Sequence, residues 1–143
     1  RYEKTMENGM NKKVTEPYLV DALSFTEAEA RIIEEMTPFI SGEFTVSDIK
    51  RANYSELFPC EEDAADRWFK CKLVFITLDE KSGAEKKTST QVLVQAADLR
   101  DAVKKLDEGM KGTMADYQIA SVAETAIMDV YPYSAEPNDK PEV

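Results

Sequence analysis

Histidine is absent from this 143-residue sequence, and that absence narrows the possible chemistry more than any other feature. Histidine is the commonest general base and the commonest transition-metal ligand, so Ser-His-Asp and Cys-His catalysis are excluded. Only two cysteines are present, Cys60 and Cys71. Without CxxC spacing they predict neither a disulfide framework nor a zinc site, and we expect two reduced thiols in a cytoplasmic protein.

Glycine, long apolar runs and positive charge are also scarce. The five glycines form no GxGxxG, P-loop or GxSxG motif. No apolar run approaches the roughly 18 residues that cross a membrane. The net charge is −10, so nucleic-acid binding would require a local cluster of basic side chains. We therefore expect no cofactor, no metal, no catalytic residue and no membrane contact.

The sequence does contain an internal repeat with a period of 73–74 residues. The matched segments are Lys12-Lys13 with Lys86-Lys87, Tyr18–Ala22 with Val92–Ala96, Phe25 with Leu99, Ala28 with Ala102, Ile32 with Leu106, Met36 with Met110, and Phe58-Pro59 with Tyr131-Pro132. Turns, apolar positions and terminators recur in the same order. This pattern predicts two diverged copies of one β-β-α-β unit.

The first copy begins with a hairpin signal. Asn8-Gly9 marks a tight turn before a predicted strand from about Lys13 to Val20, and Pro17 should lie there at an edge or bulge. Ser24 and Glu27 have the spacing of a capping box at the start of a helix. The copy closes with a segment of strand character, Glu43–Leu57.

The second copy repeats this order. Strands are predicted at Trp68–Leu78 and Thr88–Gln95, joined by a turn that contains Ser82-Gly83. Asp98 is the expected N-cap of the second helix. A longer closing segment, Tyr117–Tyr133, suits a bent or bulged strand.

These elements predict an α+β fold with about six strands and two helices. One three-stranded unit with a single helix buries too little core, so the copies should share one core about a pseudo-two-fold axis. The expected organisation is a first repeat at 1–59, an acidic linker at 60–67, a second repeat at 68–133 and a disordered tail at 134–143. Since Trp68–Val74 has no counterpart at offset 74, we expect the native chain to begin about seven residues before Arg1, with a strand resembling WFKCKLV.

A lysine pair follows each predicted hairpin turn. Lys12 and Lys13 in the first copy, and Lys86 and Lys87 in the second, are candidate contacts for an anion or a nucleic acid. Lysines beside strands equally serve to keep sheet edges from pairing with other chains.

Aromatic side chains occupy the second closing segment. Tyr117, Tyr131 and Tyr133 are candidates for base stacking or for contact with a partner. Aromatic residues in sheets more often belong to the core.

Acidic side chains cluster on both predicted helices. They are Glu27, Glu29, Glu34, Glu35, Asp98 and Asp101. They could form a carboxylate site for acid/base chemistry or magnesium, but a solvated helix face explains them as well.

The stretches VTEPYLVDALSFTEAEARIIEEM and RWFKCKLVFITLDEKSGAEKKTSTQVLVQAADLRDA resemble a small bacterial family from Bacteroidetes that is catalogued as a domain of unknown function. The resemblance covers essentially the whole chain and implies a bacterial, cytoplasmic protein. It assigns no activity and no site residues.

The leading functional interpretation is a non-enzymatic protein-binding or regulatory module. It would bind a protein partner, or a second copy of itself through an exposed sheet edge. The alternative is nucleic-acid binding through basic hairpin tips and an aromatic sheet face. The second alternative is an enzyme that uses carboxylates or Cys71.

Overall fold

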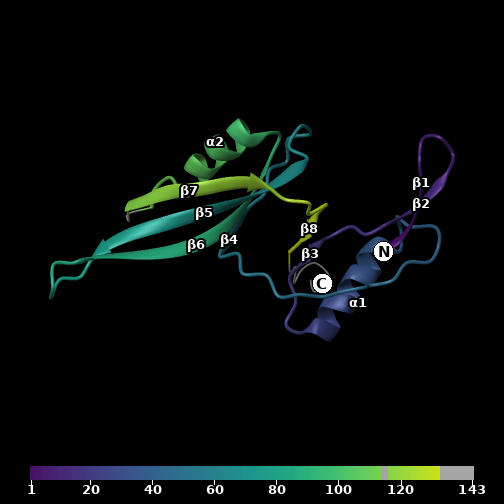
Figure 1. The fold of residues 1–143 in the computed structure, drawn as a ribbon, viewed down its shortest axis with the longest axis horizontal. Helices are drawn as coiled ribbons and strands as arrows, with labels where there is room; N and C mark the ends of the chain where they lie inside the picture. Colours follow the sequence, from purple (N-terminus) through teal and green to yellow (C-terminus); the bar gives the residue numbers. More distant parts are fainter. Residues whose placement is uncertain (114–115, 133–143) are drawn as a thin grey trace, which may run out of the picture. The chain divides into compact units, whose positions relative to one another are not determined.

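A computed structural model describes residues 1–113 and 116–132 of the chain. Within these residues the fold is α+β, with two helices and eight strands (Figure 1). The chain divides into two compact units. Unit 1 comprises Arg1–Arg51 with Ile127–Val143, and unit 2 comprises Ala52–Ala126. No helix in the described part is long and apolar enough to cross a membrane.

Unit 2 is a four-stranded sheet with one helix against it. The strands are β4 (Glu56–Phe58), β5 (Arg67–Leu78), β6 (Glu85–Ala96) and β7 (Asp116–Glu124), in the order β4-β6-β5-β7. β4 runs parallel to β6, whereas β5 runs antiparallel to both β6 and β7. The helix α2 (Leu99–Gly109) packs against β6, β7 and β4, so it covers one face of the sheet (Figure 1).

The core of the described residues lies almost entirely in unit 2. Side chains alternate between the two faces of a strand, and the β5 residues Phe69, Cys71 and Leu73 fall on the face that packs against α2. The buried apolar residues are Met36, Ala65, Trp68, Phe69, Cys71, Leu73, Val92, Leu93, Val94, Ala96, Ala102 and Leu106. Of these, Met36 is the one that belongs to unit 1.

Unit 1 contains two small sheets and one helix. β1 (Tyr2–Thr5) and β2 (Asn11–Val14) form an antiparallel hairpin. β3 (Leu19–Val20) pairs in parallel with β8 (Val130–Tyr131), and α1 (Phe25–Met36) contacts β3 (Figure 1). A strand from the end of the chain therefore completes a sheet begun near its start.

The predicted cap of the first helix is confirmed. The Glu27 N–H donates to Ser24 Oγ at 3.1 Å, and Glu27 Oε1 accepts from the Leu23 N–H at 3.1 Å. The first contact satisfies a backbone donor in the first turn that has no intrahelical partner, and the second holds the residue just before the Ser24 cap.

The second helix is capped as predicted, with an equivalent second contact. The Asp101 N–H donates to Asp98 Oδ1 at 2.8 Å, and Asp101 Oδ2 accepts from the Ala97 N–H at 3.0 Å. The helix ends at Gly109, where Phe58 from β4 packs against the glycine. Only a residue without Cβ fits this contact as it stands, because an added Cβ would lie 2.9 Å from two ring carbons.

Several predicted strands are shorter than expected. The strand predicted at Lys13–Val20 is split into β2 and β3 with Pro17 between them, since proline has no N–H for a ladder. In the predicted segment Glu43–Leu57, strand structure is limited to β4 and a single bridge between Tyr2 and Phe44. The predicted segment Tyr117–Tyr133 contains β7 and β8, so the described residues form eight strands where about six were predicted. The predicted strands Trp68–Leu78 and Thr88–Gln95 are present as the long strands β5 and β6. The tail predicted at 134–143 lies outside the described residues.

Candidate functional site

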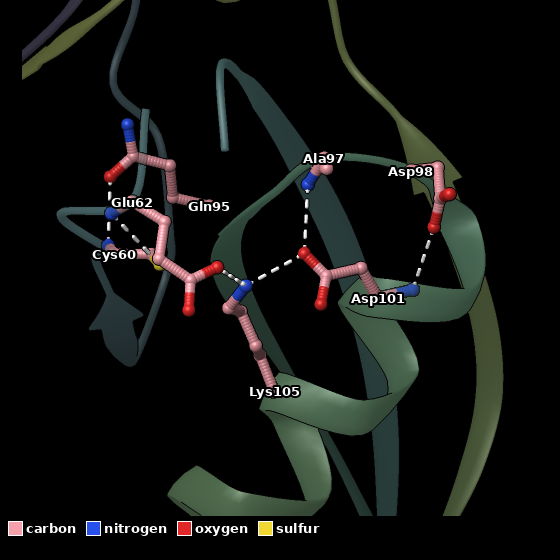
Figure 2. Close-up of polar contacts among 7 residues, drawn as sticks. All are labelled: Cys60, Glu62, Gln95, Ala97, Asp98, Asp101 and Lys105. Atoms are coloured by element: carbon pink, nitrogen blue, oxygen red, sulfur yellow. Dashed lines mark hydrogen bonds and ion pairs between the residues drawn. The ribbon is translucent and has the colours of Figure 1, made fainter. Parts of the chain in front are cut away.

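A polar cluster joins α2 to the segment that follows β4 (Figure 2). Lys105 Nζ donates to Asp101 Oδ2 at 2.7 Å and to Glu62 Oε1 at 3.0 Å. Nearby, the Cys60 N–H donates to the side-chain oxygen of Gln95 at 2.9 Å. Figure 2 shows the ammonium group between the two carboxylates.

The charges in this cluster satisfy one another. Hydrogen bonds to Asp101 and then to Glu62 raise the pKa of Lys105 above its ordinary value. The hydrogen bond from Lys105, followed by that from the Ala97 N–H, lowers the pKa of Asp101. A lysine that stays charged and a carboxyl that stays ionised are poor general acid and base near neutral pH. The arrangement is suited to hold the predicted linker against α2, and we call the contacts of Lys105 with Asp101 and Glu62 the clamp.

A shallow hollow of about 750 Å³ lies beside the clamp. Its lining consists of Phe58, Pro59, Cys60, Glu61, Glu62, Lys105, Glu108 and Gly109. Across residues 1–113 and 116–132 no group of three or more Cys, Asp or Glu side chains is arranged to hold a metal ion. The helix carboxylates Glu27, Asp98 and Asp101, considered above as a reactive cluster, instead accept backbone hydrogen bonds at the starts of their helices.

The two cysteines occupy different surroundings, and both are free thiols. Cys71 is fully buried in β5, and burial raises the pKa of its thiol to about 11. The thiolate is the nucleophilic form, so Cys71 is poorly suited to act as one. Cys60 is partly exposed.

The lysine pair of the first hairpin does not share one face. Lys12 lies directly opposite Lys4, and Lys13 lies opposite Glu3. Neighbouring residues of a strand point to opposite sides, so Lys12 and Lys4 form a basic pair while Lys13 faces an acidic side chain. Residues 1–14 carry four basic and two acidic side chains, which makes this hairpin locally positive on an acidic chain.

The lysine pair of the second hairpin is also divided between two faces. Lys86 is opposite Thr77, and Lys87 is opposite Ile76. Neither lysine has a basic residue as its direct partner on β5. The two hairpins therefore differ, and the Lys4–Lys12 pair belongs to the first alone.

The tip of the first hairpin presents apolar side chains that the sequence analysis did not single out. Met6 and Met10 are 39% and 66% exposed, and the Met6 N–H donates to the Met10 carbonyl at 2.8 Å. Gly9 holds the turn with φ +83°, and Asn8 Oδ1 accepts from the Met10 N–H at 3.0 Å. Two methionines beside an Asn-Gly turn are the sequence signal, because loop tips usually lie at the surface.

The tyrosine candidates mainly pack within the protein. The Tyr117 ring lies 6.1 Å from that of Phe75, and its hydroxyl donates to Asp107 at 3.4 Å. The Tyr131 ring is stacked on Tyr18 with centroids 6.1 Å apart, and burial raises the pKa of Tyr131. Stacking on nucleic-acid bases would have to displace these contacts. Tyr133 lies outside the described residues.

Comparison with known proteins gives one match. A family model described as a domain of unknown function (DUF4494) matches residues 1–133. No curated protein matches, and no solved structure matches. The resemblance to a family without an assigned activity is thus confirmed, and the chain belongs to the domain of unknown function family DUF4494.

Proposed function

We propose that the chain is a non-enzymatic protein-binding module, built from two copies of one β-β-α-β unit, and that its β1–β2 hairpin contacts the partner. The observation that carries this proposal is the exposed pair Met6 and Met10 at the tip, with Lys4 and Lys12 facing each other behind it. Methionine side chains are flexible and polarizable, and they suit adaptable protein contacts.

Local contacts that recur at the repeat spacing support the duplication. The Leu23–Glu27 and Ala97–Asp101 hydrogen bonds are 74 residues apart. So are the hydrogen bonds within the two turns, from the Met10 N–H to Asn8 and from the Ala84 N–H to Ser82. Gly9 and Gly83, also 74 apart, both have positive φ, at 83° and 72°.

The strand pairing also recurs, but with the closing strands exchanged. β4, from the predicted first repeat, pairs with β6 of the second, whereas β8, from the second, pairs with β3 of the first. The registers of the two pairings match. The pair Leu57–Leu93 corresponds to Val130–Leu19, and the pair Phe58–Val94 corresponds to Tyr131–Val20. The hydrogen bonds from Ser55 N–H to the Gln91 carbonyl (2.8 Å) and from Met128 N–H to the Pro17 carbonyl (2.9 Å) correspond in the same way. These matches favour an ancestral duplication with exchanged closing strands, and the pseudo-two-fold relation stays a prediction.

The chemistry of the hairpin defines its partner. The tip offers two apolar side chains, and the strands behind it carry an excess of positive charge on a chain of net charge −10. A fitting protein partner has an apolar pocket for Met6 and Met10, rimmed by acidic groups that face Lys4 and Lys12.

Quantitative affinity capture from cells that make the protein tests this contact. The full chain is compared with Met6→Ser/Met10→Ser and with Lys4→Glu/Lys12→Glu, and Lys86→Glu/Lys87→Glu on the other hairpin is the matched control. We expect one defined protein to be lost about 10-fold or more from both first-hairpin variants, because interface anchors cost about 1.4 kcal/mol or more when removed. The control should retain it. Equal recovery by all four chains contradicts the proposal.

Nucleic-acid binding is a second candidate, favoured by the direct juxtaposition of Lys4 and Lys12. The same capture with and without nuclease separates the two functions. A partner that disappears after nuclease treatment, and whose binding falls steeply with added salt, identifies nucleic acid as the ligand.

A further inference from the structure

One side of β3 carries no strand among the described residues. On its other side the N–H groups of Leu19 and Asp21 donate to the carbonyls of Asp129 and Tyr131, at 3.1 and 3.0 Å. Successive residues of a strand direct their backbone groups to opposite sides, so Val20 directs its groups away from β8. β8 is the only described strand that pairs with β3.

In unit 2 the corresponding side is filled by the first part of β5. Within β5 and β6, Cys71 pairs with Val92, Phe69 with Val94, and Arg67 with Ala96. At the repeat spacing of 74, the three β6 residues correspond to Tyr18, Val20 and Ala22. The open side of β3 is thus the position that Arg67–Leu73 occupies in the other unit.

Side chains of unit 1 are less buried than their counterparts in unit 2, as expected if the strand position beside β3 is unfilled. In unit 2, five apolar residues packed with Phe69, Cys71 and Leu73 are fully buried: Val92, Val94, Ala96, Ala102 and Leu106. Their counterparts Tyr18, Val20, Ala22, Ala28 and Ile32 are all only half-buried. Among the described residues, unit 1 has the sheet and helix surface of such a core but no strand that covers it.

The pairing of β1 shows how such a strand would enter. Tyr2 bridges to Phe44, and Arg1 exchanges backbone hydrogen bonds of 2.8 and 3.0 Å with Thr45. The same antiparallel pairing joins Phe75 to Tyr117, and Val74 to Gln118, in unit 2. β1 therefore corresponds to the second part of β5. Because β5 is one continuous strand, a chain that passes straight into β1 through Arg1 runs along the open side of β3.

We propose that the open side of β3 takes up an extended segment that runs antiparallel to β3 and continues directly into β1. Its alternate residues are apolar, at the positions of Phe69, Cys71 and Leu73 in β5. The segment pairs with the backbone of Val20 and covers the half-buried residues of β3 and α1. This inference rests on the proposed duplication but not on the hairpin contact.

The test joins a copy of the nine residues Ala65–Leu73 directly before Arg1 of the full chain. Hydrogen exchange measured by NMR should slow about 100-fold or more at the Val20 amide, as for an amide that moves from an open edge into a central strand. The thermal midpoint should rise as well. Two control extensions are matched in length or composition. One carries Ser at the positions copied from Phe69, Cys71 and Leu73, and the other has one added Gly before Arg1, which turns the apolar residues to the wrong face.

Three results overturn the proposal. One is equal exchange at Val20 with the native-pattern and Ser-substituted extensions. Another is a chain without extension that sediments as a dimer with Val20 protected, since a second copy then occupies the edge. If the fusion fails to fold, the same nine residues are added as a free peptide, and no slowing at Val20 at millimolar peptide refutes the inference. Partner capture by the hairpin variants is read separately, so failure of one proposal is distinguishable from failure of the other.

Discussion

The contact between Gly109 and Phe58 predicts that Gly109→Ala destabilises the otherwise unchanged protein but stabilises a Phe58→Ala variant. A Cβ added at Gly109 would lie 2.9 Å from two carbons of the Phe58 ring and 3.1 Å from a third. Overpacking of this kind costs about 1–3 kcal/mol. Replacing glycine by alanine in a helix gains up to about 1 kcal/mol, and Gly109 is the last helical residue, so the gain there is smaller. We expect Gly109→Ala to lower the free energy of unfolding by about 1 kcal/mol.

The Phe58→Ala background removes all three clashing ring atoms. Phe58→Ala alone should cost about 3 kcal/mol, because it leaves a cavity beside α2. In that background Gly109→Ala should stabilise by about 0.5 kcal/mol, since helix propensity then acts without a clash. The resulting coupling energy of about 1.5 kcal/mol lies in the range found for residues in contact.

Urea unfolding provides the assay. Trp68 is the single tryptophan, is buried in unit 2, and therefore reports on the unit that contains both mutated positions. Thermal midpoints should shift by roughly 4–8 °C per kcal/mol for a unit of this size. If Gly109→Ala destabilises equally in both backgrounds, the close approach of Phe58 is not what selects glycine.

Three further outcomes are expected. Lys105→Met should lower the urea midpoint at about pH 7 but by much less at about pH 2.5. The reason is that the lowered pKa of Asp101 contributes stability above about pH 4, and this stability is lost as the carboxyl is protonated. A decrease of the midpoint that is independent of pH would contradict the proposed contact between Lys105 and Asp101. A thiol reagent at about pH 8 should modify Cys60 in the folded protein but Cys71 only during unfolding, because Cys71 is buried and its pKa is raised. Rapid reaction of both thiols would refute the burial of Cys71. Gly83→Ala should cost about 1 kcal/mol because φ is +72°, while Gly83→Asn should cost less; thermal midpoints that do not differ between the two variants would show that the turn relaxes.

The local elements were the predictable part of the fold. Ser24 and Asp98 as helix caps, and the turn at Asn8-Gly9, depend on interactions within four residues of each other. The α+β class followed from the order of these elements. Pro17 was predicted at an edge position or a bulge within one strand, but it lies between strands and separates β2 from β3.

The strand partners could not be predicted. A strand of two or three residues, such as β8 or β4, has no periodic pattern, and its partner lies about 110 or 36 residues away along the chain. The Lys105–Glu62 ion pair is hidden for the same reason, because the two residues are separated by 43 positions. Lys86 and Lys87 were predicted to act as one pair, although strand alternation directs them to opposite sides, and their partners on β5 are known only from the structure.

The pairing of β3 with β8 affects the order in which the protein can be completed during synthesis. Unit 2 is a continuous stretch, Ala52–Ala126, so all of its strands are synthesised before β8. Unit 1 begins first but needs Val130–Tyr131, and its early elements must wait for more than 100 residues to be translated. At typical translation rates of about 5–20 residues per second this is a delay of several seconds. The nascent β3 is therefore without its β8 partner, and exposed to chaperones or to a neighbouring chain, throughout the synthesis of unit 2.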